Sequence, residues 1–146
     1  MTTTYLPAQT TTRFFTESKQ RWAGRVLSAL PVLFLIMDAT MKLLQVPVAV
    51  QGTMRLGYPA GMIVPLGIIE AISLVLYLYP RTSLFGVIIL TGYLGGAVAT
   101  HVHAGDPLFS HILFPVYFAT FLWGGLCLRD RRVRYALRVT GSLHNA

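Results

Sequence analysis

Four long, nearly uncharged apolar segments dominate the sequence, and they set the strongest limit on its fold. They cover roughly residues 26–44, 61–79, 83–102 and 108–128. A helix needs about 20 apolar residues to cross a hydrocarbon core of ~30 Å. Lipid offers the backbone no hydrogen-bond partners, so spanning segments must satisfy their own polar groups. The sequence therefore predicts an all-α membrane domain over residues 26–128.

The composition agrees with lipid as the solvent for most of the surface. Hydrophobic residues make up 54% of the 146 residues and charged residues only 12%, whereas soluble domains carry about 25% charged residues. The first apolar segment is not read as a signal peptide, because a long polar region precedes it and three further apolar segments follow. A single cysteine, Cys127, excludes an intramolecular disulfide and a Cys-x-x-Cys redox pair.

The placement of the basic residues predicts the orientation of the chain. The formal net charge is +7, and most lysines and arginines cluster at the two ends. Counting with both termini inside, ten basic residues face the cytoplasm, and only Lys42 and Arg55 face the other side. By the positive-inside rule we expect a multi-pass membrane protein with both termini on the cytoplasmic side. The same placement explains the basic charge without nucleic acid and adds attraction to the lipid bilayer.

The connections between the apolar segments predict how the helices are arranged. Residues 80–82 and 103–107 are short links rich in turn formers, and short links favour antiparallel neighbours. Residues 45–60 are long enough to hold a short re-entrant or interfacial piece. We therefore predict an up-down bundle of four transmembrane helices, preceded by a polar, disordered segment (1–25) and followed by a basic tail (129–146).

Small residues and prolines predict where the helices pack and bend. Gly92 and Gly96 form a Gly-x-x-x-Gly motif that Ala99 continues, so we expect a neighbouring helix to approach this face closely. Pro31, Pro65 and Pro115 lie inside apolar segments, where a proline removes a backbone hydrogen bond and bends the helix.

Three ionisable residues lie within the predicted spans, and each needs a partner or a purpose. A charge at mid-helix costs about 2.5 to 3.5 kcal/mol on insertion scales. Asp38 and Lys42 are spaced i,i+4 and can pair on one helix face; Lys42 could also extend to the interface. Glu70 has no cation in its own segment, which leaves protonation, a partner on another helix or a wet cavity.

Histidines gather at the end of the third segment and the start of the fourth. Two of them, His101 and His103, would point about 160° apart on a continuous helix, so they cannot chelate one metal together. His103 falls on the Gly92 and Gly96 face, and we expect it to point into the bundle while His101 points away. A metal or haem site stays open as an alternative to simple helix capping, although no metal is predicted.

The predicted topology brings these polar residues into one half of the bundle. The first and third segments run outward and the fourth begins outside, so their polar ends meet above Glu70. Polar residues clustered in this way are typical of a ligand pocket or a proton-linked site. The predicted ligand-binding residues are Asp38, Lys42, Glu70, His101, His103 and His111.

Several stretches of the sequence are characteristic of one family. The most specific is GYLGGAVATH (residues 92–101), followed by PLFSH (107–111) and LFP (113–115). Shorter stretches include Asp38-Ala39 with Lys42-Leu43, then LGYP (56–59) and YPRT (79–82). In these stretches, and over about residues 26–134, the chain resembles the DoxX-like family of small bacterial membrane proteins. The resemblance implies a four-helix membrane fold, in agreement with the analysis of the apolar segments.

For function, the resemblance implies an association with quinone-linked redox metabolism, and it carries no catalytic motif. The leading hypothesis is a small inner-membrane subunit or accessory factor, working with an oxidoreductase, that binds a quinone or a similar amphipathic molecule. Its head group would contact Glu70, His103 or His111 and its tail would lie along Phe114, Phe118 and Leu122. The alternative is a non-catalytic structural or assembly protein, or homo-oligomer, whose buried charges organise helix packing. A small transporter is a third, weaker hypothesis.

Overall fold

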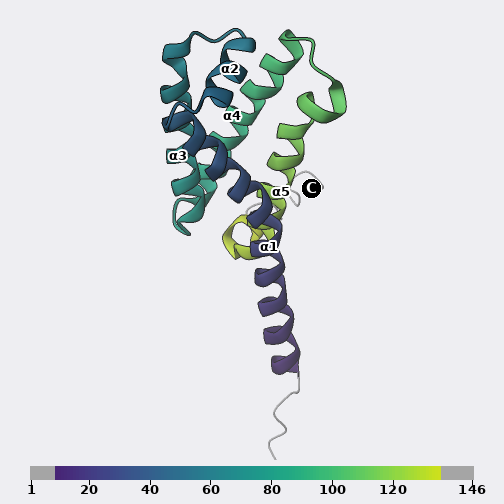
Figure 1. Cartoon of the computed structure of the whole chain (residues 1–146). Coiled ribbons are helices and arrows are strands. Elements are labelled where there is room, and N and C mark those ends of the chain that lie inside the picture. The colour runs from purple at the N-terminus through teal and green to yellow at the C-terminus, as the bar shows by residue number, and fades with distance from the viewer. Residues whose placement is uncertain (1–8, 136–146) are drawn as a thin grey trace, which may run out of the picture.

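The structure is a computed structural model that describes residues 9–135, with side chains from Ser18 onward. Within that range every regular element is helical and no strand occurs. The elements are α1 (Gln9–Leu43), α2 (Pro47–Arg55), the 3₁₀ turn η1 (Ala60–Met62), α3 (Ile63–Leu78), α4 (Ser83–His103), the π-helical turn η2 (Leu108–Ile112) and α5 (Phe114–Arg129) (Figure 1).

The four long helices form the predicted up-down bundle. The helices in contact are α1 with α3, α3 with α4, α4 with α5, and α5 with α1, so chain order is also spatial order (Figure 1). Four segments are long and apolar enough to cross a membrane: Ser18–Leu43, Ala60–Leu78, Ser83–His103 and Leu108–Arg129. These segments agree closely with the predicted spans, except that the first begins earlier.

The bundle has two ends, which we name by their contents. The arginine end contains residues 18–28 of α1, the turn at residues 79–82 and the end of α5. The pocket end contains α2, the beginning of α3, the end of α4 and η2 (Figure 1, upper end). The predicted interfacial piece in residues 45–60 is α2, which begins with Pro47 in its first turn, where the missing proline N–H has no cost to the helix.

The amino-terminal part of the chain differs from the expectation for residues 1–25. Helix α1 begins at Gln9, so residues 9–25 are helical rather than disordered. Up to Gly24 this stretch has no glycine or proline to interrupt a helix, and a helix that has already been nucleated adds further turns easily. Residues 1–8 and 136–146, which include most of the predicted basic tail, lie outside the described residues; residues 131–135 are helical.

Two of the three prolines lie where a helix tolerates them, contrary to the prediction that all three bend their helices. Pro65 is in the first turn of α3 and Pro115 in the first turn of α5. A proline there removes an N–H that has no intrahelical partner. Pro31 alone of these lies deep inside a helix, and α1 changes direction along its length (Figure 1).

The helices pack most closely at the arginine end, through glycines that the sequence analysis did not select. A Cβ atom on Gly24 would lie 2.7 Å from the carbonyl oxygen of Gly125, and a Cβ on Gly86 would collide with the Tyr77 backbone. The Tyr77 hydroxyl group is fully buried and bonds both Ser28 Oγ at 2.8 Å and the Leu122 carbonyl at 2.9 Å. Three helices are thereby joined at one buried hydroxyl.

The Gly-x-x-x-Gly motif of α4 does not mediate helix packing, contrary to the prediction. Cβ atoms added to Gly92, Gly95 or Gly96 would meet nothing within 4 Å. Gly92 and Gly96 instead border the large cavity described below. Small residues permit a close approach but do not enforce one, and at this position the space is left open.

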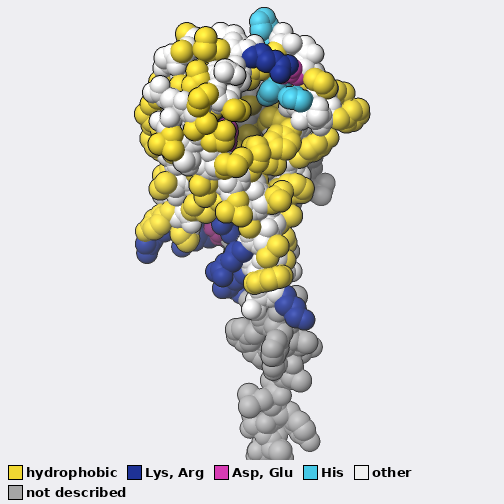
Figure 2. All heavy atoms as spheres, in the orientation of Figure 1, with side chains coloured by type: hydrophobic (Ala, Val, Ile, Leu, Met, Phe, Trp, Pro, Cys, Tyr) yellow, Lys and Arg dark blue, Asp and Glu magenta, His cyan; other side chains and the backbone are white. Residues whose placement is uncertain are grey.

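The outer surface of the bundle is apolar over most of its height. Large hydrophobic side chains such as Leu33, Ile72 and Ile88 are more than half exposed, and only about 30% of each spanning segment is buried inside the bundle. Figure 2 shows hydrophobic atoms over this face, with lysine and arginine atoms collected mainly below them. This surface suits contact with lipid.

Candidate functional site

A large cavity occupies the pocket end of the bundle. Its volume is about 620 Å³, which is within the ~300–1,000 Å³ range of small-molecule sites. Its walls come from α1, α2, α4 and α5, with Leu66 contributed by α3. Figure 2 shows the upper part of the molecule hollowed, with histidine, lysine or arginine atoms at the rim.

One wall of the cavity is built around Lys42, which joins three helices. Its ammonium nitrogen donates to Asp38 Oδ2 at 2.5 Å, to Glu70 Oε2 at 2.9 Å and to the Tyr93 hydroxyl at 2.7 Å. The Tyr93 hydroxyl in turn donates to Glu70 Oε2 at 2.9 Å. An ammonium group has three hydrogens, so every donor of Lys42 is used. We call Asp38, Lys42, Glu70 and Tyr93 the lysine network.

The lysine network settles which of the open alternatives holds for Glu70. This residue is completely buried on α3 and reaches the cation of α1, because Gly67, one turn earlier, lets the side chain of Lys42 lie against the backbone of α3. The predicted pairing of Asp38 with Lys42 is also confirmed. Glu70 Oε1 remains buried without a hydrogen-bond partner.

The members of the lysine network differ in their access to the cavity. Asp38, Lys42 and Tyr93 line it, whereas Glu70 stands behind them. The Asp38 side chain is 34% exposed and that of Lys42 is 13% exposed. Of the two carboxylate oxygens of Asp38, Oδ2 accepts from Lys42, and no described residue bonds Oδ1. A bound molecule would therefore meet an acceptor, Asp38, rather than a free donor.

The rim of the cavity is held by a second ionic group centred on Asp106. Its carboxylate accepts from Arg55 Nη2 at 2.6 Å through one oxygen and contacts His101 Nδ1 at 2.7 Å through the other. This connection joins α2 to the end of α4 across the mouth of the cavity. The hydrogen bond from His101, with the nearby charge of Arg55, holds the pKa of the Asp106 carboxyl below its ordinary value.

His111 completes the rim from η2. Its ring lies edge-on to that of His101, with centroids 5.7 Å apart, and its Nδ1 is 2.8 Å from Ser110 Oγ. When Ser110 donates to Nδ1, the ring proton is on Nε2 and can be donated to a ligand. We call Arg55, His101, Asp106 and His111 the rim group.

Aromatic rings form the wall beneath the polar groups. Phe34, Phe114 and Phe118 contact one another edge-on or tilted, with centroid distances of 4.4 to 5.2 Å. All three line the cavity, and Phe34 lies one helical turn before Asp38. The cavity thus combines a polar mouth, an acidic side wall and an aromatic interior. Leu122, expected to line the same path, belongs to the packed core instead.

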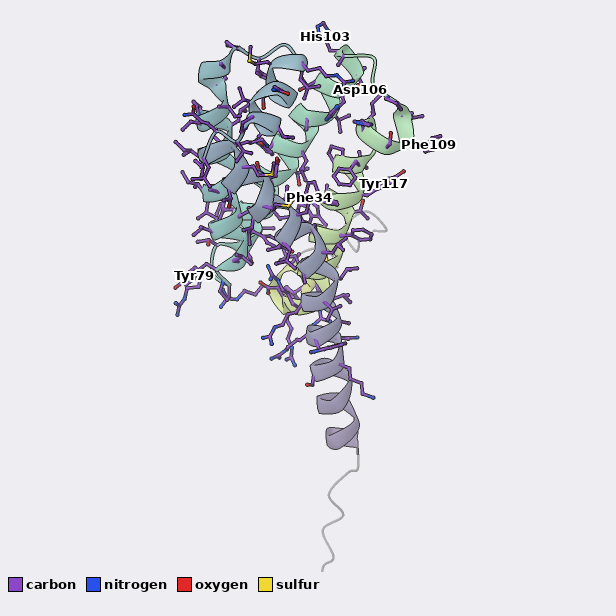
Figure 3. All side chains as sticks on the ribbon, in the orientation of Figure 1. Phe34, Tyr79, His103, Asp106, Phe109 and Tyr117 are labelled. Atoms are coloured by element: carbon purple, nitrogen blue, oxygen red, sulfur yellow. The ribbon has the colours of Figure 1, made fainter. Side chains whose placement is uncertain are left out.

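The structure reverses the predicted directions of His101 and His103. His101 points to the cavity and bonds Asp106, whereas His103 is exposed and does not line the cavity; in Figure 3 it projects from the end of α4 away from the bundle. The buried residues of α4 include Val87, Leu90 and Leu94. His101 lies seven residues, or about two turns, after Leu94 and therefore shares this inward face, whereas His103 lies on the opposite side of the helix.

Five of the six predicted site residues thus meet at the pocket end, and His103 does not. Among the described side chains, no group of three or more His, Cys, Asp and Glu could hold a metal ion. Three residues of the site were not predicted to belong to it: Tyr93, Arg55 and Asp106. A sequence signal existed for Asp106, which follows His101 by one residue more than a helical turn, but Arg55 approaches from a helix 51 residues away in sequence.

Comparisons with known proteins agree with the fold. No curated protein and no solved structure matches this chain. A sequence model described as the DoxX-like family matches residues 26–125. The match extends from the first spanning segment to the last and includes both the lysine network and the rim group. Four spanning helices in this order, together with that match, show that the chain is a multi-pass membrane protein and belongs to the DoxX-like family.

Proposed function

We propose that this protein binds an amphipathic small molecule of the quinone type in the cavity at the pocket end, as an accessory factor or small subunit of redox metabolism. The observation that carries the proposal is one cavity of about 620 Å³ with a polar mouth and an aromatic interior. The polar mouth suits the head group of such a molecule, and the aromatic interior suits its apolar tail. The family resemblance supplies the expectation of a quinone.

The arrangement of donors suggests how such a molecule would lie. Lys42 has no free hydrogen, so a carbonyl oxygen would accept from the rim group, where His111 Nε2 and the exposed Arg55 guanidinium can donate. The tail would then extend past Asp38 to Phe34, Phe114 and Phe118. The predicted contacts of the head group with Glu70 and His103 are wrong, because neither residue lines the cavity.

The test is a binding measurement with decylubiquinone on the full chain in nanodiscs of phosphatidylcholine. His111→Ala is expected to weaken binding about tenfold, which corresponds to the loss of one hydrogen bond. His103→Ala is the matched control, since it removes the same side chain outside the cavity, and should leave binding unchanged. Absence of any saturable binding by the unmodified protein would refute the proposal.

A second candidate function is structural, and one specific observation favours it. All three hydrogens of Lys42 are used in contacts that tie α1 to α3 and α4, as expected of a group that organises a bundle or its assembly with a partner. Glu70→Gln would then lower the thermal stability or the yield of an assembled complex. It would do so without changing decylubiquinone binding at the rim.

The proposal includes the orientation of the chain in the inner membrane. The arginine end carries the clustered basic residues, so the positive-inside rule places it in the cytoplasm and opens the cavity to the opposite side. Labelling of single cysteines at positions 55 and 81 with a membrane-impermeant maleimide, in a Cys127→Ser background, tests this. Only the cysteine at position 55 should react from outside intact cells.

A further inference from the structure

The lysine network contains one more acid than base, and its spare acid opens into the cavity. Two carboxyl groups, Asp38 and Glu70, surround a single ammonium group, Lys42. The rim group adds no net positive charge to offset the surplus, because Arg55 is paired with Asp106. With these groups ionised, the cavity therefore has a net charge of −1 within the membrane-spanning part of the chain, where uncompensated charge is costly.

The surplus negative charge is accessible to a ligand at one atom. Lys42 contacts Asp38 through Oδ2, and no described residue bonds Asp38 Oδ1. Asp38 lines the cavity and its side chain is 34% exposed. Glu70 Oε1 is also without a partner, but it is completely buried behind the wall. Of the two carboxylates of the lysine network, a ligand in the cavity can therefore reach only that of Asp38.

The surroundings of Asp38 suit a positive charge. Phe34 precedes it by one turn on the same face of α1, and Phe34 packs edge-on against Phe114 and Phe118. Ring faces attract cations, and groups of aromatic side chains recognise alkylammonium ligands in proteins. Asp38 would supply the counter-charge in such a site and the rings would supply both the cation–π contacts and the apolar walls.

We propose that Asp38, with the Phe34, Phe114 and Phe118 rings, forms a binding site for a protonated amine that carries an apolar group. The N–H of the ammonium donates to Asp38 and its apolar group packs in the aromatic interior. The inference rests on the cavity being a ligand site, as proposed above, but it does not require that the ligand there is a quinone. A cavity of about 620 Å³ holds one such molecule, so amine and quinone would compete.

The test compares two probes of the same shape, of which only one has a positive charge and an N–H donor. One is 4-phenyl-N,N-dimethylbutylamine, which is protonated at neutral pH, and the other is its carbon isostere, in which CH replaces NH⁺. Binding is measured on the full chain in nanodiscs of phosphatidylcholine, whose zero net charge does not concentrate the cation at the bilayer. We expect the amine to bind about tenfold more tightly than the isostere.

Three variants assign the preference to Asp38. Asp38→Asn should abolish the tenfold preference, and Asp38→Glu, which keeps the charge, should retain it. Asp130→Asn is the matched control, because it makes the same chemical change beyond the end of α5, and should retain it too. If Asp38→Asn fails to fold, Phe34→Leu should reduce the preference while leaving the carboxylate in place.

The outcomes separate this inference from the proposed function. Equal binding of the two probes, or a preference that survives Asp38→Asn, would overturn the inference and indicate that a proton balances the surplus acid. Binding of decylubiquinone without any amine binding would overturn the inference alone. The inference is supported only if the amine binds, the isostere binds more weakly and Asp38 accounts for the difference.

Discussion

The two ends of the bundle are built from the same kinds of residue but have opposite packing. At the arginine end, Gly24, Gly86 and Gly125 bring helix backbones into contact. At the pocket end, Gly92 and Gly96 border a cavity in which added Cβ atoms would meet nothing. Each end also has a tyrosine hydroxyl with more than one partner. Tyr77 bonds neutral groups, whereas Tyr93 bonds an ammonium and a carboxylate.

The arginine end therefore supplies packing stability, whereas the pocket end surrounds an open cavity with charged side chains. Tight backbone contact provides dispersion attraction that lipid does not replace, and it is concentrated near Tyr77. At the pocket end Gly67 brings α3 against α1, but the groups around the cavity are held together by ion pairs. Substitutions at matched positions should therefore have different consequences at the two ends.

The largest effect is expected from removing the cation of the lysine network. Lys42→Met leaves the buried carboxyl of Glu70 without its ionic partner, and breaking a buried pair costs about 3–5 kcal/mol. Denaturation in detergent micelles would measure the loss, with the exposed Lys19→Met at the arginine end as the control. Adding Glu70→Gln to Lys42→Met should recover part of the stability. If the two lysine substitutions lowered the stability equally, Lys42 would have no special role in holding the pocket end together.

The next largest effect is expected from adding a methyl group to a glycine at each end of the bundle. Gly86→Ala places a Cβ against the backbone of Tyr77, which cannot move aside without displacing α3, and overpacking costs about 1–3 kcal/mol. Gly96→Ala adds the same methyl group in open space and should be neutral or stabilising by a few tenths of a kcal/mol. Melting temperatures of the two variants provide the measurement. A Gly86→Ala protein as stable as Gly96→Ala would contradict the assignment of close packing to this end.

A smaller effect separates the two tyrosines. Tyr77→Phe removes hydrogen bonds to Ser28 and Leu122 and should cost about 1 kcal/mol of stability, with ligand binding unchanged because Tyr77 does not line the cavity. Tyr93→Phe should cost a similar amount and also change ligand affinity. Parallel denaturation and decylubiquinone titrations test both. Altered binding in Tyr77→Phe would show that the ends are coupled.

The smallest effect concerns the acid behaviour of the rim. The pKa of Asp106 is lower in the folded protein than its ordinary value, so the folded state binds fewer protons at this group. Its contribution to stability is complete above an ordinary Asp pKa of about 4 and is lost as the pH falls through the lower folded-state value. Asp106→Asn should remove this acid-dependent part of the melting curve. Melting temperatures measured from acid to neutral pH would show an unchanged slope if the assignment were wrong.

The sequence predicted the elements of this fold better than their rotation. The length and apolarity of each span, the turn at residues 80–82 and the i,i+4 pairing of Asp38 with Lys42 follow from local rules, and each is present. The partner of Glu70 stayed open because it lies 28 residues away on another helix. Local rules give the spacing of residues on one helix, but they do not give the neighbour that each face meets.

The rotation of a helix about its own axis could not be predicted where hydropathy carries no information. In a spanning helix both the lipid face and the buried face are apolar, so α4 offered only its glycines as a guide, and they pointed to His103 instead of His101. A glycine marks backbone contact in one place, as at Gly86, and open space in another, as at Gly92 and Gly96. Which applies depends on side chains from other helices, here Phe34, Phe114 and Phe118, that surround the space without filling it.

The ion pair within α1 has a consequence for how the chain enters the membrane. Domains and segments are made from the amino terminus onward, so α1 leaves the ribosome before α3. Asp38 and Lys42 neutralise one another inside that single helix, and it can be inserted as an electrically balanced unit. Glu70 is made later and has no cation in its own helix, and its ionic partner in the folded protein is Lys42 of the first span. The order of synthesis therefore makes the cation before the buried acid that needs it.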